Sequence, residues 1–162
     1  MSNKEVRLAT LDDVDSLLDL LKDMHEETGL FPLSEGKVGR IVQAAIFPTY
    51  GQARSAVVGV IGAPQALEAS IALAPTQLYY TEAYHLGDMW HYVRPDCRNT
   101  EHADHLIAFA KACADKMGLD FISGVVSTDR TDAKMRLYRK HFGAFLGGYF
   151  MHRHMNGSNV NG

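Results

Sequence analysis

The sequence predicts a single α/β (α+β) domain in which a mixed, mostly antiparallel twisted sheet is flanked by helices. Three stretches between 55 and 93 alternate like strands and are joined by short links, which predicts an antiparallel meander. Stretches with apolar residues at helical spacing lie before and after this block. The expected order of elements is therefore β-α-α-β-β-β-α-β-α-β.

Length, charge and cysteine content restrict the class of protein. The 162 residues are 46% hydrophobic and 22% charged, which suits one domain with a single core at 1–155 and a disordered polar tail at 156–162. The formal net charge of −3 offers no basic balance for binding nucleic acid. Two cysteines are too few for a disulfide framework, and no apolar run is long enough to span a membrane. We therefore expect a cytoplasmic protein.

The first part of the chain is typical of one strand followed by two helices. A short alternating strand at 6–9 leads to Thr10, which is placed to cap a helix, with Asp13 in the capping-box position. Apolar residues then fall on one helical face, and Gly29 is a plausible end of this helix. The second helix follows Ser34 and ends before Pro48.

The middle of the chain changes to the period of strands. The expected strands are 55–62, 67–74 and 86–93, with a turn between the first two. The polar and aromatic stretch 76–85 is expected to be a loop.

The last part alternates helices with strands. A helix is expected from about Glu101 to Met117, ended by Gly118. The apolar run 119–127 is typical of a strand buried on both faces, parallel to 86–93 because a helix connects the two. A helix at 131–142 and a final strand at 145–153 complete the predicted fold.

The junction between strand 86–93 and the helix after it has the features of an anion site. Pro95 marks the end of the strand, and Asn99 or Thr100 is placed to cap the helix. The first amides of a helix point outward at the positive end of its dipole. Arg98 adds a bidentate phosphate donor at this position, so the junction predicts a cradle for a diphosphate.

This junction resembles motif A of the GCN5-related N-acetyltransferases (the GNAT family), which reads V-x-P-x-x-R-x-x-G-x-G/A-x-x-L. The matching positions here are Val93, Pro95, Arg98, Ala103 and Leu106. Glu101 stands where the family has its first motif glycine. The later stretch "RLYRKHFG" resembles the family's closing helix with its "LY" pair, and the order of elements agrees from Val6 to about Arg153.

The resemblance implies an N-acetyltransferase. Such an enzyme transfers an acetyl group from acetyl-CoA, its co-substrate, to a primary amine by direct attack in a ternary complex. The acceptor is left open, as either a small molecule or a peptide. The resemblance also implies a homodimer, formed through sheet edges or the final strand. The alternative is a non-catalytic relative that binds CoA or a protein partner.

The resemblance further assigns catalytic roles. Tyr138 aligns with the family's tyrosine general acid, because a phenol with a pKa near ~10 can protonate a thiolate whose pKa is near ~8.5. The general base is left open between Asp88 and its rivals Glu82 and His85. Each of these residues has an alternative role, as a core aromatic or as an exposed polar side chain.

The cofactor is expected to contact the strand backbone with its thioester and pantetheine, and the start of the following helix with its diphosphate. Basic residues of the closing helix are candidates for its phosphates. The residues expected at the cofactor are Trp90, His91, Tyr92, Val93, Arg98, Asn99, Thr100, Glu101, His102, Ala103, Arg130 and Lys134.

The histidines and the cysteine of the stretch 91–106 raise the alternative of a metal site. His102 and His105 are three residues apart, and His91 lies on the preceding strand. No Cys-x-x-Cys or His-x-x-x-His spacing accompanies them, so we expect no metal. Cys97 sits near a helix N-terminus, where thiol pKa values fall, but its position points to the diphosphate and argues against an acyl-enzyme.

The acceptor site is the least defined part of the prediction. An aromatic-lined pocket is one hypothesis, with Glu26, Glu27 or Glu82 attracting an ammonium group. Its aromatic residues are Phe31, Tyr79, Tyr80, Tyr84 and Trp90.

Overall fold

The computed structural model describes residues 5–28, 30–47 and 56–152. The predicted disordered tail at 156–162 and the predicted helix end at Gly29 lie outside the described residues. No described helix is long and apolar enough to cross a membrane.

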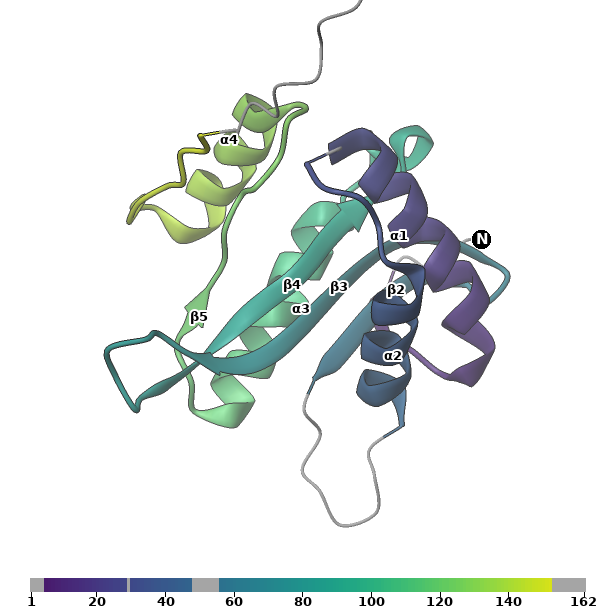
Figure 1. Ribbon diagram of the computed structural model, residues 1–162, viewed down its shortest axis with the longest axis horizontal. Helices are drawn as coiled ribbons and strands as arrows, with labels where there is room; N and C mark the ends of the chain where they lie inside the picture. Colours follow the sequence, from purple (N-terminus) through teal and green to yellow (C-terminus); the bar gives the residue numbers. More distant parts are fainter. Residues whose placement is uncertain (1–4, 29, 48–55, 153–162) are drawn as a thin grey trace, which may run out of the picture.

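A five-stranded sheet forms the centre of the molecule (Figure 1). Its strands follow the order of the chain: β1 (Arg7–Leu8), β2 (Val57–Ala63), β3 (Ala66–Gln77), β4 (Tyr84–Val93) and β5 (Phe121–Ile122). The first four pair antiparallel, and β5 pairs parallel to β4 after a helical crossover. The predicted fold class is confirmed: a mixed, mostly antiparallel sheet with flanking helices.

Helices cover both faces of this sheet. The helices are α1 (Val14–Thr28), α2 (Glu35–Ile46), α3 (His102–Met117) and α4 (Thr131–Phe142). Buried residues of α1 and α2 form one core cluster with β2, β3 and β4, and those of α3 form a second with the same three strands. The sheet therefore lies between α1 and α2 on one face and α3 on the other.

The predicted caps at Thr10 and Gly118 form. Before α1, the backbone N–H of Thr10 donates to Asp13 Oδ2 at 2.7 Å, so the capping box forms. Gly118 ends α3 with φ 66°, the left-handed conformation that glycine adopts without a steric penalty.

A β-bulge interrupts β4 near its middle. Leu73 of β3 pairs with Asp88, but the preceding residue Ala72 pairs with Trp90, so Met89 is an extra residue on β4. In a regular strand, side chains three positions apart point to opposite faces. The extra residue shifts this alternation, so that Asp88 and His91 can face the same side.

Beyond the bulge, β4 and β5 separate. Their pairing is limited to Leu86 with Phe121 and Gly87 with Ile122. The chain after β5 runs away from β4 toward α4, as Figure 1 shows. Among the described residues, β4 from Asp88 onward therefore has a strand neighbour on the β3 side alone.

Two predictions about the end of the fold are wrong. The expected buried strand at 119–127 is reduced to the two residues of β5, and Val126 is 57% exposed. No strand forms within 145–152; Leu146 and Tyr149 are each 87% exposed. The two errors are linked, because a missing last strand leaves β5 without an outer neighbour to extend its ladder. The glycine pair at 147–148 also disfavours a strand.

The meander is longer than expected. β3 continues to Gln77 and β4 begins at Tyr84, so the loop between them is 78–83 rather than 76–85. Gln77 pairs with Tyr84 at the end of the ladder, which extends it beyond the apolar core of both strands.

Candidate active site between β4, α4 and α1

Tyr138 of α4 and His91 of β4 meet on the side of the sheet where β4 has lost its β5 neighbour. Tyr138 Oη and His91 Nδ1 lie 2.7 Å apart and share a hydrogen bond. The Tyr138 ring stacks on Phe142 with centroids 5.7 Å apart, and Phe142 in turn contacts Phe121 of β5. The helical spacing of Tyr138 and Phe142 therefore places the phenol against β4.

The imidazole of His91 is neutral at physiological pH. Burial, with the nearby charges of Lys134 and His141, lowers the pKa of His91 to about 4. A neutral ring carries one N–H donor and one acceptor nitrogen. His91 Nε2 has no hydrogen-bond partner among the described residues, so the bond to Tyr138 is the polar contact that the structure gives this ring.

Asp88 lies on the same side, as the bulge allows. Its Oδ1 accepts a hydrogen bond from the backbone N–H of Gly124 at 3.3 Å. Burial raises the pKa of the Asp88 carboxyl, although nearby donors from Ser123 and Gly124 partly oppose the increase. A carboxylate with a raised pKa accepts a proton more readily than an exposed aspartate.

The phenol of Tyr138 holds its proton firmly. Burial raises the pKa of Tyr138 well above its ordinary value, and the negative charge of Asp88 raises it further. The structure thus brings together a protonated phenol, a neutral imidazole and a carboxylate that favours protonation. This set, Asp88, His91 and Tyr138, is called the proton-transfer group below.

The second part of the site lies at the other end of β4, where the chain enters α3. Arg98 Nη2 donates to both carboxylate oxygens of Glu27 on α1, at 2.7 and 2.6 Å. Arg98 Nε donates to the carbonyl of Val93 at 3.1 Å, and the hydroxyl of Tyr92 donates to Glu27 Oε1 at 2.9 Å. Arg98, expected to be a free phosphate donor, is therefore already paired with a carboxylate of the chain.

The start of α4 brings further positive charge to this place. Lys134 lies close enough to Glu27 and Arg98 for both to influence its charge, and Lys134 Nζ donates to Ser127 Oγ at 2.6 Å. Burial lowers the pKa of Lys134, and the nearby Arg98 and Arg130 act in the same direction. The set Glu27, Arg98 and Lys134 is called the cation cluster below.

The residues just before α4, Thr128 to Arg130, connect the start of this helix to the end of α1. Arg130 precedes α4 with φ 53°, a left-handed conformation that is uncommon outside glycine. Thr128 Oγ1 donates to the carbonyl of Thr28 at the end of α1, at 2.6 Å. The segment between β5 and α4 thus fixes where Arg130 and Lys134 stand relative to Glu27.

The helix start differs from its predicted form. The N-cap residue of α3 is Glu101, not Asn99 or Thr100, although Thr100 Oγ1 accepts a hydrogen bond from the backbone N–H of His102 at 3.3 Å. The Glu101 side chain is exposed and lies 3.9 Å from His105 Nε2. Asn99 and Thr100 are exposed in the turn between Arg98 and Glu101, and Ala103 follows within the first turn of α3.

His102, Cys97 and Glu68 form a cluster beneath this turn. His102 is 1% exposed, and its Nε2 lies 2.5 Å from Glu68 Oε2 on β3. Burial, followed by the charges of Asp96 and Glu68, raises the pKa of the Cys97 thiol to about 11. The sequence-based expectation of a lowered thiol pKa is therefore wrong, because burial and two nearby carboxylates raise the pKa of this thiol.

The remaining predicted residues lie apart from these two groups. Glu82 is exposed in the loop 78–83, where its carbonyl accepts a bond from Gln77 Nε2. Trp90 packs in the core on the α1 side, and its Nε1 donates to Ser70 Oγ at 3.0 Å. Tyr79 is fully exposed, so the expected aromatic pocket does not form around it.

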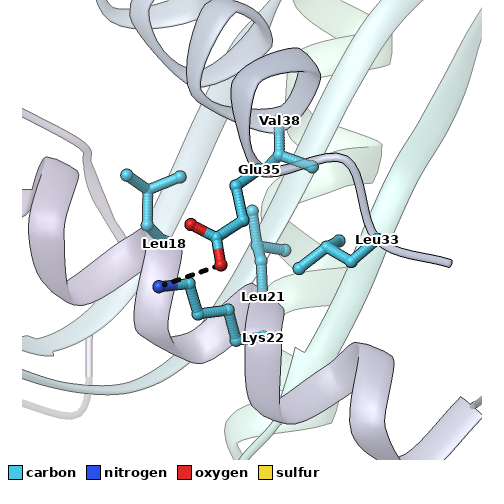
Figure 2. Close-up of a pocket in the computed structure, with 6 residues that line it drawn as sticks. All are labelled: Leu18, Leu21, Lys22, Leu33, Glu35 and Val38. Carbon is cyan, nitrogen blue, oxygen red and sulfur yellow. Dashed lines mark ion pairs between the residues drawn. The ribbon is translucent and has the colours of Figure 1, made fainter.

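A shallow depression lies elsewhere, between α1 and α2 (Figure 2). An ion pair spans it, with Lys22 Nζ 3.6 Å from Glu35 Oε1. Its lining residues are Leu18, Leu21, Lys22, Leu33, Glu35 and Val38. None of them belongs to the proton-transfer group or the cation cluster.

Comparison with known proteins defines the fold. The sequence matches no family model and no curated protein. One similar solved structure is a predicted acetyltransferase with acetyl-CoA from Clostridium acetobutylicum, at TM-score 0.73 and 15% identity, covering 94% of this chain and 96% of that chain. A possible acetyltransferase from Clostridium difficile 630 gives TM-score 0.66 and 18% identity, with coverage of 94% and 97%.

A third similar structure is a ribosomal-protein-alanine N-acetyltransferase from Brucella melitensis biovar Abortus, at TM-score 0.65 and 16% identity, covering 93% of this chain and 99% of that chain. The chain therefore has the fold of the GCN5-related N-acetyltransferases. At these identities the likeness concerns the fold, and the activity has to be argued from the site.

Proposed function

We propose that this protein is an N-acetyltransferase that transfers an acetyl group from acetyl-CoA to a primary amine. The observation that carries the proposal is the Tyr138 hydroxyl, bonded to His91 at the point where β4 has lost its β5 neighbour. The protonated phenol at this open strand edge is the proposed donor to a leaving thiolate. Its raised pKa makes it a weak acid, so the transfer depends on close contact with the negative sulfur.

The unpaired edge of β4 beyond Asp88 is suited to the pantetheine arm, because strand backbone groups can bond its amides as they would another strand. The cation cluster is suited to the diphosphate. The ion pair between Arg98 Nη2 and both carboxylate oxygens of Glu27, with Lys134 nearby, supports anion binding by Arg98. Binding of the diphosphate then requires Arg98 to exchange Glu27 for phosphate.

The proposed reaction is direct attack of the amine on the thioester carbonyl in a ternary complex. The new bond is C–N, the bond broken is C–S, and the leaving thiolate takes its proton from Tyr138. If His91 donates its Nδ1–H to Tyr138 Oη, the phenol proton is free to point at the sulfur. Asp88, with its raised pKa, is placed to take the proton that the amine must lose.

A second candidate function is a non-catalytic CoA-binding or protein-interaction module. The observation in its favour is that Arg98 is neutralised by Glu27, while Glu101 adds a negative charge at the start of α3. Both features oppose an anionic ligand.

The test is thiol release from acetyl-CoA in the presence of a panel of primary amines, with the acetylated product confirmed by mass spectrometry. Similar structures suggest two panel members, an aminoglycoside antibiotic and a peptide with N-terminal alanine. Amine-dependent thiol release supports the proposal. Binding of acetyl-CoA by calorimetry without turnover of any amine would favour a non-catalytic CoA-binding module. The absence of both would refute acetyl transfer and CoA binding, and would favour the protein-interaction module.

A further inference from the structure

The geometry points to a zinc site formed by Glu68, Cys97 and His102, beneath the turn that leads into α3. A carboxylate oxygen, the thiol sulfur and a ring nitrogen of these residues lie within 4.8 Å of one another. They come from three places in the chain: β3, the 3₁₀ turn after β4, and the first residue of α3. The inference does not depend on the proposed acetyl transfer.

The burial of His102 indicates that this is an interior site and not a surface contact. The ring is 1% exposed, and its Nδ1 has no hydrogen-bond partner among the described residues. The nitrogen that faces the cluster is Nε2, which lies 2.5 Å from Glu68 Oε2. Nε2 would therefore be the metal ligand, with the cation taking the place of the proton between the ring and the carboxylate.

The charges around the cluster favour a cation. Cys97 Sγ lies 3.6 Å from Asp96 Oδ1, and both Asp96 and Glu68 place negative charge on the thiol. The neighbouring Arg94 pairs with Asp23, and Arg98 pairs with Glu27. A divalent cation would be attracted by the negative charge of Asp96 and Glu68 on the thiol.

The donor set selects the metal. Thiolate, imidazole and carboxylate together suit Zn²⁺, whereas Mg²⁺ and Ca²⁺ prefer oxygen ligands alone. Ligand atoms of a tetrahedral zinc lie roughly 3.3–3.6 Å apart, so the three groups must shift by about 1 Å. Glu68 can supply this movement, because its long side chain is partly exposed. Three protein ligands leave the fourth position to water.

Metal binding at this cluster would tie together the two ends of one turn. Cys97 precedes and His102 follows the residues Arg98 to Glu101, which connect β4 to α3. Coordination requires Cys97 to lose its proton, so zinc uptake releases a proton and becomes weaker as the pH falls. The turn should become more rigid in the zinc form.

The experiment uses the tag-free full chain, stripped with a chelator and dialysed. Calorimetry should show binding of about one Zn²⁺ per chain, with release of a proton. Co²⁺ should give a thiolate-to-metal charge-transfer band that reports Cys97 directly. Cys97→Ser should remove this band and weaken Zn²⁺ binding by at least on the order of 10²-fold.

Two control variants come from the same helix. Cys113→Ser and His105→Gln should retain both the band and the affinity, because neither residue belongs to the cluster. Glu68→Gln should weaken Zn²⁺ binding and provides a second test, since the buried His102 is less safely replaced. Equal Zn²⁺ affinity in wild type and Cys97→Ser, or a Co²⁺ complex without the thiolate band, would overturn the proposal.

Discussion

The proton-transfer group and the cation cluster lie at two places along β4. They differ in whether their side chains are free to act on a ligand. Asp88, His91 and Tyr138 are already gathered, with the phenol bonded to the imidazole. In the cation cluster, Arg98 is held by Glu27 from α1, and Tyr92 bonds the same carboxylate. Under the proposed function, the first place is already assembled for proton transfer, while the second holds an internal anion where the diphosphate is proposed to bind.

The difference indicates that binding and chemistry are limited by different residues. A proton donor has to be in place before the reaction, because positioning is part of its catalytic contribution. A phosphate-binding arginine can instead exchange one anion for another, at the expense of some affinity. Substitutions at the proton-transfer group should therefore change kcat, and those at the cation cluster should change cofactor affinity.

The largest expected effect is that of Tyr138→Phe on turnover. The substitution keeps the ring that stacks on Phe142 and removes the hydroxyl that bonds His91. We expect kcat to fall by on the order of 10²-fold, with little change in acetyl-CoA affinity. Steady-state rates with an accepted amine, and calorimetry with acetyl-CoA, measure the two quantities. A phenylalanine variant with near-wild-type kcat would return Tyr138 to a packing role.

The next effect is that of Asp88→Asn, which should lower kcat/KM roughly 10-fold near neutral pH. Raising the pH should restore part of the rate, because the amine then loses its proton without a base. A pH profile of kcat/KM for both proteins tests this. If the deficit is the same at every pH, Asp88 does not act as the base.

Asp88→Asn should also raise the free energy of unfolding slightly, by less than ~1 kcal/mol at neutral pH. The carboxyl has a raised pKa in the folded state, so its ionised form opposes folding above that pKa. The difference between the two proteins should vanish as the pH falls below ~3.9, where the folded and unfolded states are both protonated. Denaturant titrations across pH measure it.

A smaller effect is expected for Glu27→Gln in the cation cluster. Removing the carboxylate charge frees Arg98, so acetyl-CoA should bind about 5-fold more tightly, equivalent to an ion pair of ~1 kcal/mol. The matched control is Glu26→Gln, an exposed neighbour on α1. Calorimetry measures the acetyl-CoA affinity of both variants. Weaker binding in Glu27→Gln than in the control would contradict the proposal that Arg98 exchanges Glu27 for the diphosphate.

The smallest effect is expected outside both groups, for Phe150→Ser. This side chain is fully exposed, so the free energy of unfolding of the monomer should change by less than ~0.5 kcal/mol. The homodimer stays a prediction, and the exposed apolar segment 145–152 is the surface proposed for it. Light scattering should then show a weaker dimer for the variant, and equal masses for the two proteins would exclude this surface.

The sequence was informative wherever a local pattern determines the backbone. The capping box at Thr10, the left-handed Gly118 and the crossover from β4 to β5 all follow from short-range rules. Motif spacing likewise placed Arg98 at the start of α3 and Tyr138 on α4.

The side-chain partners were not predictable in the same way. Glu27 reaches Arg98 across 71 positions of sequence, and no local pattern reports such a pairing. The bulge at Met89, which places Asp88 and His91 on one side, depends on the register with β3. The last strand was predicted from its apolar composition alone, and residues 145–152 have no strand partner among the described residues.

The most direct test of the central claim is a crystal structure of the protein with CoA. We predict that the sulfur lies within about 3–3.5 Å of Tyr138 Oη, in reach of its proton. The diphosphate should contact Arg98, with Glu27 turned away from it. A sulfur that lies out of reach of Tyr138 Oη would contradict the account.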